Sequence, residues 1–318
     1  SLLMHLINFS GDESLKRDFI VMSDISPAEL FKLLKEARKM KIERGKVRKD
    51  LAGKTIAMIF EKPSTRTRVS FEVGIRELGG NVIFLGTQEM QLSRGETIFD
   101  TAKTLSRYVH GIIARVSAHE TLVEFAKYSD VPVINALSPL EHPCQALADL
   151  LTIYEKKGKL KGVKLAWIGD GNNVCNSLLI ACGMTGMNIS VATPKGYEPP
   201  VEIVKKAKEF ASKSGSKIEI LNDPRTALIG AEVVYTDVFV SMGQEKEKEK
   251  RMRDFSGFKV TEELMSFAEP DAIFMHCLPA HRGEEVDPEV IDGPKSVVFD
   301  QAENRLHAQK ALLKFLIT

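Results

Sequence analysis

Hydrophobic and polar positions alternate along the chain in a way that predicts short buried strands separated by helices. Residues 54–60 (KTIAMIF) and 163–169 (VKLAWIG) are apolar runs of the kind that a parallel sheet buries on both faces. Residues 26–29 (SPAE) form a capping box with proline at the first helical position, and they predict a helix that ends near Gly45.

The same alternation continues to the C-terminus and restarts near residue 143. Two successive series of strand–helix units predict two doubly wound, parallel-sheet α/β domains with right-handed crossovers, bridged by the helix near 143–157. We expect further strands at 81–85, 111–116, 131–136, 188–193, 217–221, 233–238, 272–278 and 296–300. We expect helices from 64 to 79 and through 102–108, and at 119–128, 143–158, 174–185, 200–213, 224–229, 261–268 and 304–316.

Composition and charge argue against several classes of protein. The chain has 44 Lys and Arg against 43 Asp and Glu, so no overall charge draws it to nucleic acid or to an acidic membrane. Its apolar runs are far shorter than the ~20 residues that span a bilayer, and we see no signal-peptide pattern. The four cysteines lack CxxC and zinc-finger spacing and are interpreted as reduced thiols. These features predict a cytoplasmic protein.

Polar residues follow the predicted strands in both halves of the chain. In parallel α/β sheets, ligands bind at the carboxyl ends of the strands, so we expect a cleft between the two domains to carry the chemistry. The residues at this edge are 63–68 (PSTRTR), Arg115, 142–145 (HPCQ), 170–173 (DGNN), Asp237 with 241–243 (SMG), and 276–279 (HCLP).

Residues 64–68 (STRTR) carry the sharpest chemical signal. A helix N-terminus offers free backbone N–H groups and the positive end of the helix dipole. The three hydroxyl groups add donors, and a guanidinium matches the oxygens of phosphate. The segment therefore predicts a phosphate site with Arg66 as the contact and Arg68 as support. The alternative is a solvated helix cap with surface arginines.

Other strand-end residues allow both a functional and a structural interpretation. Arg115 could bind an anion or pair with a distant carboxylate. His142 and Gln145 share a helix face and could hold a carbonyl oxygen and an amide, or His142 could cap the helix. Asp237 could pair with a substrate ammonium group or form a turn. Cys277 could be a nucleophile, a hydrogen-bonding group or a buried small side chain.

Two further segments carry weaker signals, although the two asparagines of the first could hydrogen-bond a carboxylate or an ammonium group. Residues 169–174 (GDGNNV) fail the dinucleotide fingerprint, because Val174 replaces the third glycine and no acidic residue follows at the right distance. A nicotinamide site is therefore not expected. Residues 245–254 (EKEKEKRMRD) are almost entirely charged and are interpreted as a solvated flap in a charged loop.

Together the motifs strongly resemble the carbamoyltransferase family over nearly the whole chain. Asp237 followed by 241–243 (SMG) marks ornithine, rather than aspartate, as the acceptor within that family. The resemblance implies transfer of the carbamoyl group of carbamoyl phosphate to the δ-amine of ornithine. The other motifs occur in the family's order, namely STRTR at 64–68, HPCQ at 142–145, DGNN at 170–173 and HCLP at 276–279.

The resemblance also implies a domain layout and a role for each matched residue. Residues 1–140, completed by a C-terminal helix (304–318) that packs back on them, would bind carbamoyl phosphate, and residues 141–303 would bind ornithine. Gln91 would be lent to a neighbouring subunit, which implies a homotrimer or a multiple of trimers. The implied carbamoyl phosphate contacts are Ser64, Thr65, Arg66, Thr67, Gln91, Arg115, His142, Gln145 and Arg305. The implied ornithine contacts are Asn173, Asp237, Ser241, Met242, Cys277 and Leu278.

The implied chemistry needs neither a metal ion nor an organic cofactor. The amine of ornithine has a pKa near 10.4 and is mostly charged at neutral pH, so Asp237 and Cys277 would orient it and receive or relay its proton. Thr67, Arg115 and His142 would stabilise the tetrahedral oxyanion. We expect no covalent intermediate on Cys277, because the amine is itself a competent nucleophile. Putrescine or an N-acylated ornithine remain alternative acceptors, and a non-catalytic module for phosphorylated metabolites is the alternative from another class.

Overall fold

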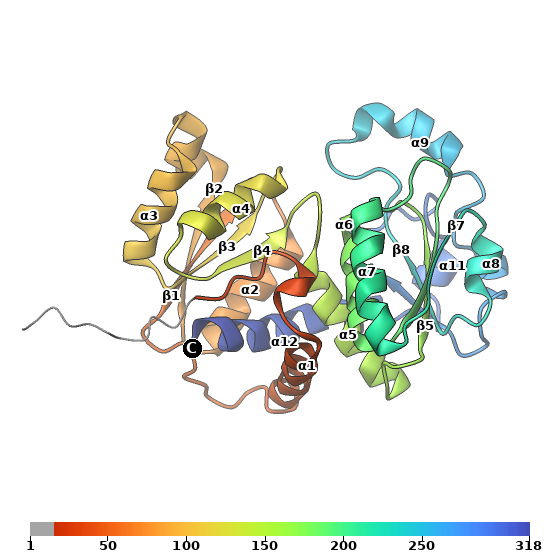
Figure 1. Ribbon diagram of the computed structural model, residues 1–318, viewed down its shortest axis with the longest axis horizontal. Coiled ribbons are helices and arrows are strands. Elements are labelled where there is room, and N and C mark those ends of the chain that lie inside the picture. The colour runs from red at the N-terminus through yellow and green to blue at the C-terminus, as the bar shows by residue number, and fades with distance from the viewer. Residues whose placement is uncertain (1–15) are drawn as a thin grey trace, which may run out of the picture.

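A computed structural model describes residues 16–318, which form two α/β domains side by side (Figure 1). The expectation about a signal peptide concerns residues 1–15, which lie outside this range. Within the described range, no helix combines the length and the apolar character that a membrane span requires. The predicted fold class is confirmed, because each domain contains one sheet of parallel strands flanked by helices.

The first domain is built on a parallel sheet with the strand order β2-β1-β3-β4. Alternation along β1 sorts its side chains, with Ile56 and Met58 packing toward α2 and α12. Ala57 and Ile59 pack on the opposite face, toward α3 and α4. The strands are β1 (Thr55–Phe60), β2 (Asn81–Gly86), β3 (Gly111–Arg115) and β4 (Val133–Leu137), and the helices are α1 (Pro27–Ile42), α2 (Thr65–Glu77), α3 (Ile98–Tyr108) and α4 (His119–Tyr128).

The second domain is built on a parallel sheet with the strand order β7-β6-β5-β8-β9. Trp167 and Tyr235, on neighbouring strands, stack with their ring centroids 5.1 Å apart and are fully buried. The strands are β5 (Lys164–Ile168), β6 (Asn188–Ala192), β7 (Ile218–Leu221), β8 (Val233–Thr236) and β9 (Ile273–His276). The helices are α6 (Asn173–Thr185), α7 (Val201–Ser214), α8 (Pro224–Leu228), α10 (Glu262–Met265) and α11 (Pro288–Ile291).

In both sheets the order in which strands are added changes side at a central strand. The chain enters at β1 or β5, builds outward on one side, and then crosses to β3 or β8 on the other side. In such sheets a ligand binds outside the carboxyl ends of the two strands at the reversal. Here those ends are Phe60 and Arg115 in the first domain, and Ile168 and Thr236 in the second.

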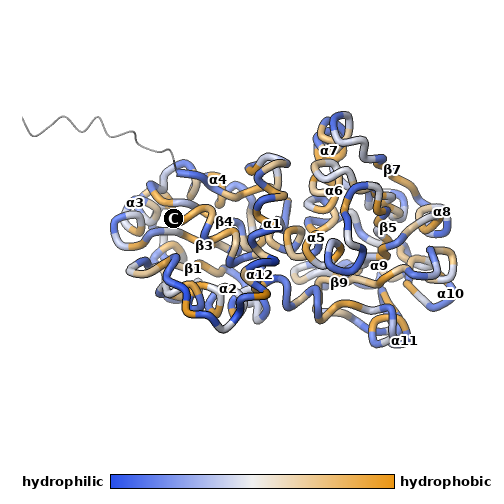
Figure 2. Tube along the Cα trace, turned by 90° about the horizontal axis from the view of Figure 1, so that it is seen from below, coloured by the Kyte–Doolittle hydropathy of each residue, from blue (hydrophilic) through white to orange (hydrophobic). Residues whose placement is uncertain are grey.

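Two helices connect the domains. α5 (Pro143–Lys157) is buried along most of its length, and α12 (Val298–Ile317) returns to pack against α5, α1 and α2 (Figure 1). The hydropathy colouring shows that α5 and the neighbouring α6 are largely apolar where the domains meet (Figure 2). Lys310 of α12 is buried and donates to Glu77 of α2 at 2.9 Å. The expected packing of the C-terminal helix on the first domain is therefore confirmed, and it brings Arg305 to α2 and α5.

One predicted strand is wrong. Residues 296–300 are not a strand, because Ser296 makes only an isolated bridge to Phe274 and α12 already begins at Val298. The apolar run before Asp300 is the first turn of a helix, in which Val298 is buried while Phe299 is 72% exposed. An apolar run this short fits either a strand or a helical turn, so the sequence alone did not distinguish them.

Candidate active site

The first part of the site is the N-terminus of α2, directly after β1. Ser64 caps the helix, and its hydroxyl accepts a hydrogen bond from the backbone N–H of Thr67 at 3.4 Å. Thr65 is exposed, Arg66 is half-buried and Thr67 is buried, so successive side chains point in different directions. The predicted helix start is confirmed, and backbone N–H groups and hydroxyls are available there to an anion.

Arg68 does not share the direction of Arg66. Its guanidinium donates to Glu72 at 3.0 Å and lies over the ring of Phe84, 3.5 Å from the centroid. Arg68 therefore links α2 to β2 and is already neutralised by a carboxylate. An open hollow of about 490 Å³ lies here, lined by Lys62–Thr65, Arg68, Phe84 and 86–89 among others, and its lining does not include the arginines described next.

Arg305 reaches the first domain from α12. It is buried and donates three hydrogen bonds, to Gln309 Oε1 at 2.8 Å, to Gln145 Oε1 at 2.9 Å and to Thr67 Oγ1 at 3.0 Å. All three acceptors are neutral. Burial lowers the pKa of Arg305, which shows how little solvent compensates its charge.

Arg66, Arg115 and Arg305 form a cluster of positive charge, which we call the arginine cluster. Burial, then the charge of Arg305, then that of Arg66 lower the pKa of Arg115 to about 10, and its Nε has no hydrogen-bond partner. Within residues 16–318, none of the three guanidiniums forms an ion pair with a carboxylate. Like charges held together without counterions are unfavourable, so the arrangement favours a bound anion.

His142 lies at the edge of this cluster, at the start of α5. Its backbone N–H donates to the hydroxyl of Ser177 at 2.9 Å, and its Nδ1 is buried without a partner. Burial, followed by the charges of Arg305 and Arg115, lowers the pKa of His142 well below its ordinary value. The imidazole is therefore neutral at pH 7 and has one N–H to donate. It does not cap α5 through its side chain.

The second domain contributes Asp237, directly after β8. Its carboxylate accepts from Asn172 Nδ2 at 2.8 Å and from the backbone N–H of Val238 at 2.7 Å. Asn173, the ornithine contact implied by the resemblance, donates with its side-chain amide to the carbonyl of Ser138 at 2.9 Å. Asn172 is therefore the member of the asparagine pair that reaches Asp237.

Cys277 and Leu278 follow β9 beside Asp237. Burial, and then the charge and hydrogen bond of Asp237, raise the pKa of Cys277 well above its ordinary value, so the thiol is neutral at pH 7. Leu278 has φ 59° and its backbone N–H donates to His276 Nδ1 at 2.8 Å. The other ring nitrogen of His276 lies 2.8 Å from the buried carboxylate of Glu285.

One set of potential metal ligands lies within the site. Atoms of Asp237, His276 and Cys277 lie within 4.8 Å of one another. Both ring nitrogens of His276 are engaged by Leu278 and Glu285. A cation would therefore have only the carboxylate of Asp237 and the sulfur of Cys277 available, which are too few protein ligands for an ordinary transition-metal site.

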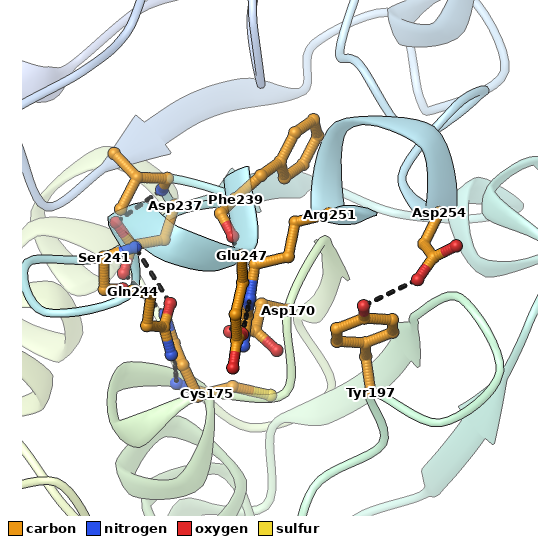
Figure 3. A network of polar contacts seen from close by, with 12 residues as sticks. Asp170, Cys175, Tyr197, Asp237, Phe239, Ser241, Gln244, Glu247, Arg251 and Asp254 are labelled. Carbon is orange, nitrogen blue, oxygen red and sulfur yellow. Dashed lines mark hydrogen bonds and ion pairs between the residues drawn. The ribbon is translucent and has the colours of Figure 1, made fainter. Parts of the chain in front are cut away.

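The segment predicted as a solvated flap is instead folded and anchored. Residues 245–254 form η4 (Glu245–Glu247) and α9 (Lys248–Asp254). Arg251 is buried, and its Nη1 donates to Asp170 at 3.1 Å and to the carbonyl of Phe239 at 3.0 Å (Figure 3). The flap interpretation is therefore wrong for Arg251, although most of the other charged side chains of the segment are exposed.

Ser241 and Met242 stand between β8 and this anchored segment. The backbone N–H of Ser241 donates to Gln244 at 2.9 Å (Figure 3). The side chain of Met242 is 55% exposed. Gln91 is exposed on η3 (Gln91–Arg94), and within the described residues no hydrogen bond joins its side chain to the other predicted site residues.

Comparison with known proteins gives the family of the chain. Residues 17–155 match the family model described as "Aspartate/ornithine carbamoyltransferase, carbamoyl-P binding domain", and residues 161–316 match its "Asp/Orn binding domain". The chain belongs to the aspartate/ornithine carbamoyltransferase family. Within this family match, Arg66 and Arg115 fall in the first range, and Asp237, Cys277 and Arg305 fall in the second.

Several similar proteins are named ornithine carbamoyltransferase. The chain is 56% identical over 303 residues to the ornithine carbamoyltransferase of Archaeoglobus fulgidus, covering 95% of this chain and 97% of that protein. It is 57% identical to that of Thermococcus kodakarensis, over 95% of this chain and 96% of the relative. The solved structure of ornithine carbamoyltransferase from Pyrococcus furiosus superposes with a TM-score of 0.92 at 55% identity, covering 95% and 97% of the two chains.

Proposed function

We propose that this protein transfers the carbamoyl group of carbamoyl phosphate to the δ-amine of L-ornithine, giving L-citrulline and phosphate. The observation that carries the proposal is the arginine cluster, in which Arg115 and Arg305 lie together and neither forms an ion pair with a carboxylate among the described residues. Asp237 and Cys277 supply the matching acceptor side, and the relatives named above support ornithine as the acceptor.

The phosphate end of the donor is assigned to the start of α2. Backbone N–H groups and the hydroxyls of Ser64, Thr65 and Thr67 donate to its oxygens, and Arg66 and Arg115 neutralise its charge. The carbamoyl end is assigned to Arg305, which donates to both Thr67 and Gln145, and to Gln145 and His142 beside it. Phosphate stays bound as the leaving group in the same cluster of donors.

The acceptor amine is assigned to the Asp237–Cys277 corner. The carboxylate of Asp237 attracts the ammonium form and then accepts or relays its proton, while Cys277 remains a neutral donor. Attack on the carbamoyl carbon produces an oxyanion, which Thr67, Arg115 and His142 stabilise through donors that are already in place. Asn173, Ser241, Met242 and Leu278 are assigned to the rest of ornithine, and the Ser241–Asp254 segment to its cover.

The domain boundaries, the assembly and the location belong to the same proposal. Residues 1–140 with 304–318 form the carbamoyl phosphate domain, and residues 141–303 form the ornithine domain. The two family models divide the chain between residues 155 and 161, so the proposal differs from them in assigning α5 to the second domain and residues 304–318 to the first. Exposed Gln91 completes the site of a neighbouring subunit in a cytoplasmic trimer or multiple of trimers. Mass measurement by light scattering tests the trimer.

A substrate panel tests the proposed function. Product formation from carbamoyl phosphate is measured with ornithine, N-acetylornithine, putrescine and aspartate, and only ornithine should give rapid turnover. Arg66→Ala should abolish most of the activity, whereas Arg68→Ala, which alters the neighbouring guanidinium bound to Glu72, should leave it nearly unchanged. Preference for another acceptor would redirect the proposal, and no turnover with any of them would refute it.

A further inference from the structure

Asp149 lies in the interior of α5, one turn after Gln145, and is fully buried. Its Oδ1 accepts from Gln145 Nε2 at 2.9 Å and from Gln301 Nε2 at 2.8 Å. Its Oδ2 accepts from the hydroxyl of Tyr235 at 2.8 Å. The carboxylate therefore joins α5, β8 and α12 at one point, and none of its hydrogen-bond donors is a cation.

The amide of Gln145 is held between two partners of fixed polarity. An ionised aspartate can only accept hydrogen bonds, so the NH₂ group of Gln145 faces Asp149. An arginine can only donate, so the oxygen of Gln145 faces Arg305, at 2.9 Å. The oxygen is thereby presented to the arginine cluster, where an acceptor for the NH₂ of a carbamoyl group is required.

The same carboxylate also reaches the acceptor side of the site. Gln301 donates to Asp149 with its NH₂ group and accepts from the backbone N–H of His276 with its oxygen, at 3.0 Å. His276 immediately precedes Cys277. One buried charge therefore fixes the polarity of two amides, one toward each half of the site.

The burial of this charge is unfavourable by itself. Burial raises the pKa of Asp149 to about 6, although the hydrogen bonds from Gln145, Tyr235 and Gln301 oppose that effect. An asparagine would fill the same volume without an ionised group in the interior. The charge of Arg305 also lowers the pKa of Asp149, so that guanidinium partly balances the buried carboxylate. An asparagine would neither provide this balance nor act as an acceptor only toward Gln145.

We infer that Asp149 is a positioning residue, which orients the amide of Gln145 so that its oxygen receives the carbamoyl NH₂ group of the donor substrate. The inference rests on the proposed function, since it concerns the same site. Asp149 is buried and does not itself contact the substrate. Through Gln145 it controls only the carbamoyl end of carbamoyl phosphate. The phosphate end, bound by the start of α2, does not depend on it.

Asp149→Asn removes the acceptor-only partner and allows the amide of Gln145 to turn. The KM for carbamoyl phosphate should rise about tenfold, the effect of one lost hydrogen bond in a buried site. The inhibition constant of inorganic phosphate should stay within about twofold, because phosphate occupies only the other end. Tyr235→Phe is the matched control, since it removes one donor to Asp149 and leaves Gln145 in place.

A second pair of variants, built on Gln145→Glu, keeps the test valid even if Asp149→Asn destabilises the fold. In Gln145→Glu, a carboxylate faces Asp149, and adding Asp149→Asn restores a donor–acceptor pair. Asp149→Asn should therefore raise the KM for carbamoyl phosphate when residue 145 is Gln and lower it about tenfold when residue 145 is Glu.

The results distinguish a failure of the inference about Asp149 from a failure of the proposed function. The reversal of sign between the two backgrounds supports positioning, whereas an equal effect in both, or an equal rise in the phosphate inhibition constant, overturns it. If Asp149→Asn alone does not fold, the Gln145→Glu pair of variants decides. Wild-type turnover reports on the proposed function, and the ratios between variants report on Asp149.

Discussion

Removal of Arg115 is the most informative perturbation, because the arginine cluster should be unfavourable without its anion. The pKa of Arg115 falls from its ordinary value of 12.5 to about 10 through burial and the charges of Arg305 and Arg66. A displacement of this size corresponds to about 3 kcal/mol. Since Arg115 is only partly buried, solvent screening reduces the figure to about 1–2 kcal/mol.

Arg115→Gln should therefore stabilise the unliganded protein by about 1–2 kcal/mol while weakening its affinity for phosphate. Urea unfolding is measured with and without inorganic phosphate, at constant ionic strength and constant protein concentration. At a phosphate concentration about ten times its Kd, the wild type should gain about 1.4 kcal/mol, and the variant much less at that concentration.

Arg68→Gln is the matched control, because it removes a guanidinium from the same region that is already paired with Glu72. Its phosphate-dependent stabilisation should equal that of the wild type, with at most about 1 kcal/mol lost from the surface pair. The reasoning is refuted if Arg115→Gln destabilises the unliganded protein and retains the full effect of phosphate.

Three further predictions concern other parts of the structure. Burial raises the pKa of Glu141 from 4.5 to about 7, so the contribution of Glu141 to stability falls as the pH rises from 4.5 to 7. Glu141→Gln should remove this pH dependence of the free energy of unfolding in urea, and it should stabilise the protein at pH 8 by up to about 3 kcal/mol. Alkylation of Cys277 by iodoacetamide should accelerate with pH to beyond about pH 9, and a plateau near pH 7 would argue for a thiolate. Arg251→Met leaves Asp170 buried and unpaired, so it should lower stability by about 3 kcal/mol. It should also raise the KM for ornithine more than the KM for carbamoyl phosphate. Equal changes in the two KM values would contradict the role of Arg251 in anchoring the Ser241–Asp254 segment.

The secondary structure was predictable where local chemistry determines it. The cap at Ser64 and the apolar runs of β1 and β5 lead directly to the observed elements. The segment 245–254 was not predictable, because it has no apolar stripe and is held by tertiary contacts, among them those of Arg251 with Asp170 and Phe239 and that of Asp254 with Tyr197. The run before Asp300 was misread because three apolar residues fit a strand or a helical turn equally well.

The site was predictable where its residues follow strands. Arg66 and Arg115 are found by that rule, but Arg305 arrives from α12 and was assigned only through the family resemblance. Asp149 was missed, although a polar residue four positions after Gln145 on an otherwise apolar helix was a usable signal. The partner of Asp237 depends on which of two adjacent asparagines faces it, and only the folded structure decides that.

The central claim is that one site between the two domains binds both substrates. A crystal structure with N-(phosphonoacetyl)-L-ornithine, which joins mimics of the two substrates, tests it most directly. The account predicts the phosphonate at the start of α2 beside Arg66 and Arg115, and the ornithine part beside Asp237 and Cys277. A phosphonate bound elsewhere, or an ornithine part directed away from Asp237, would contradict it.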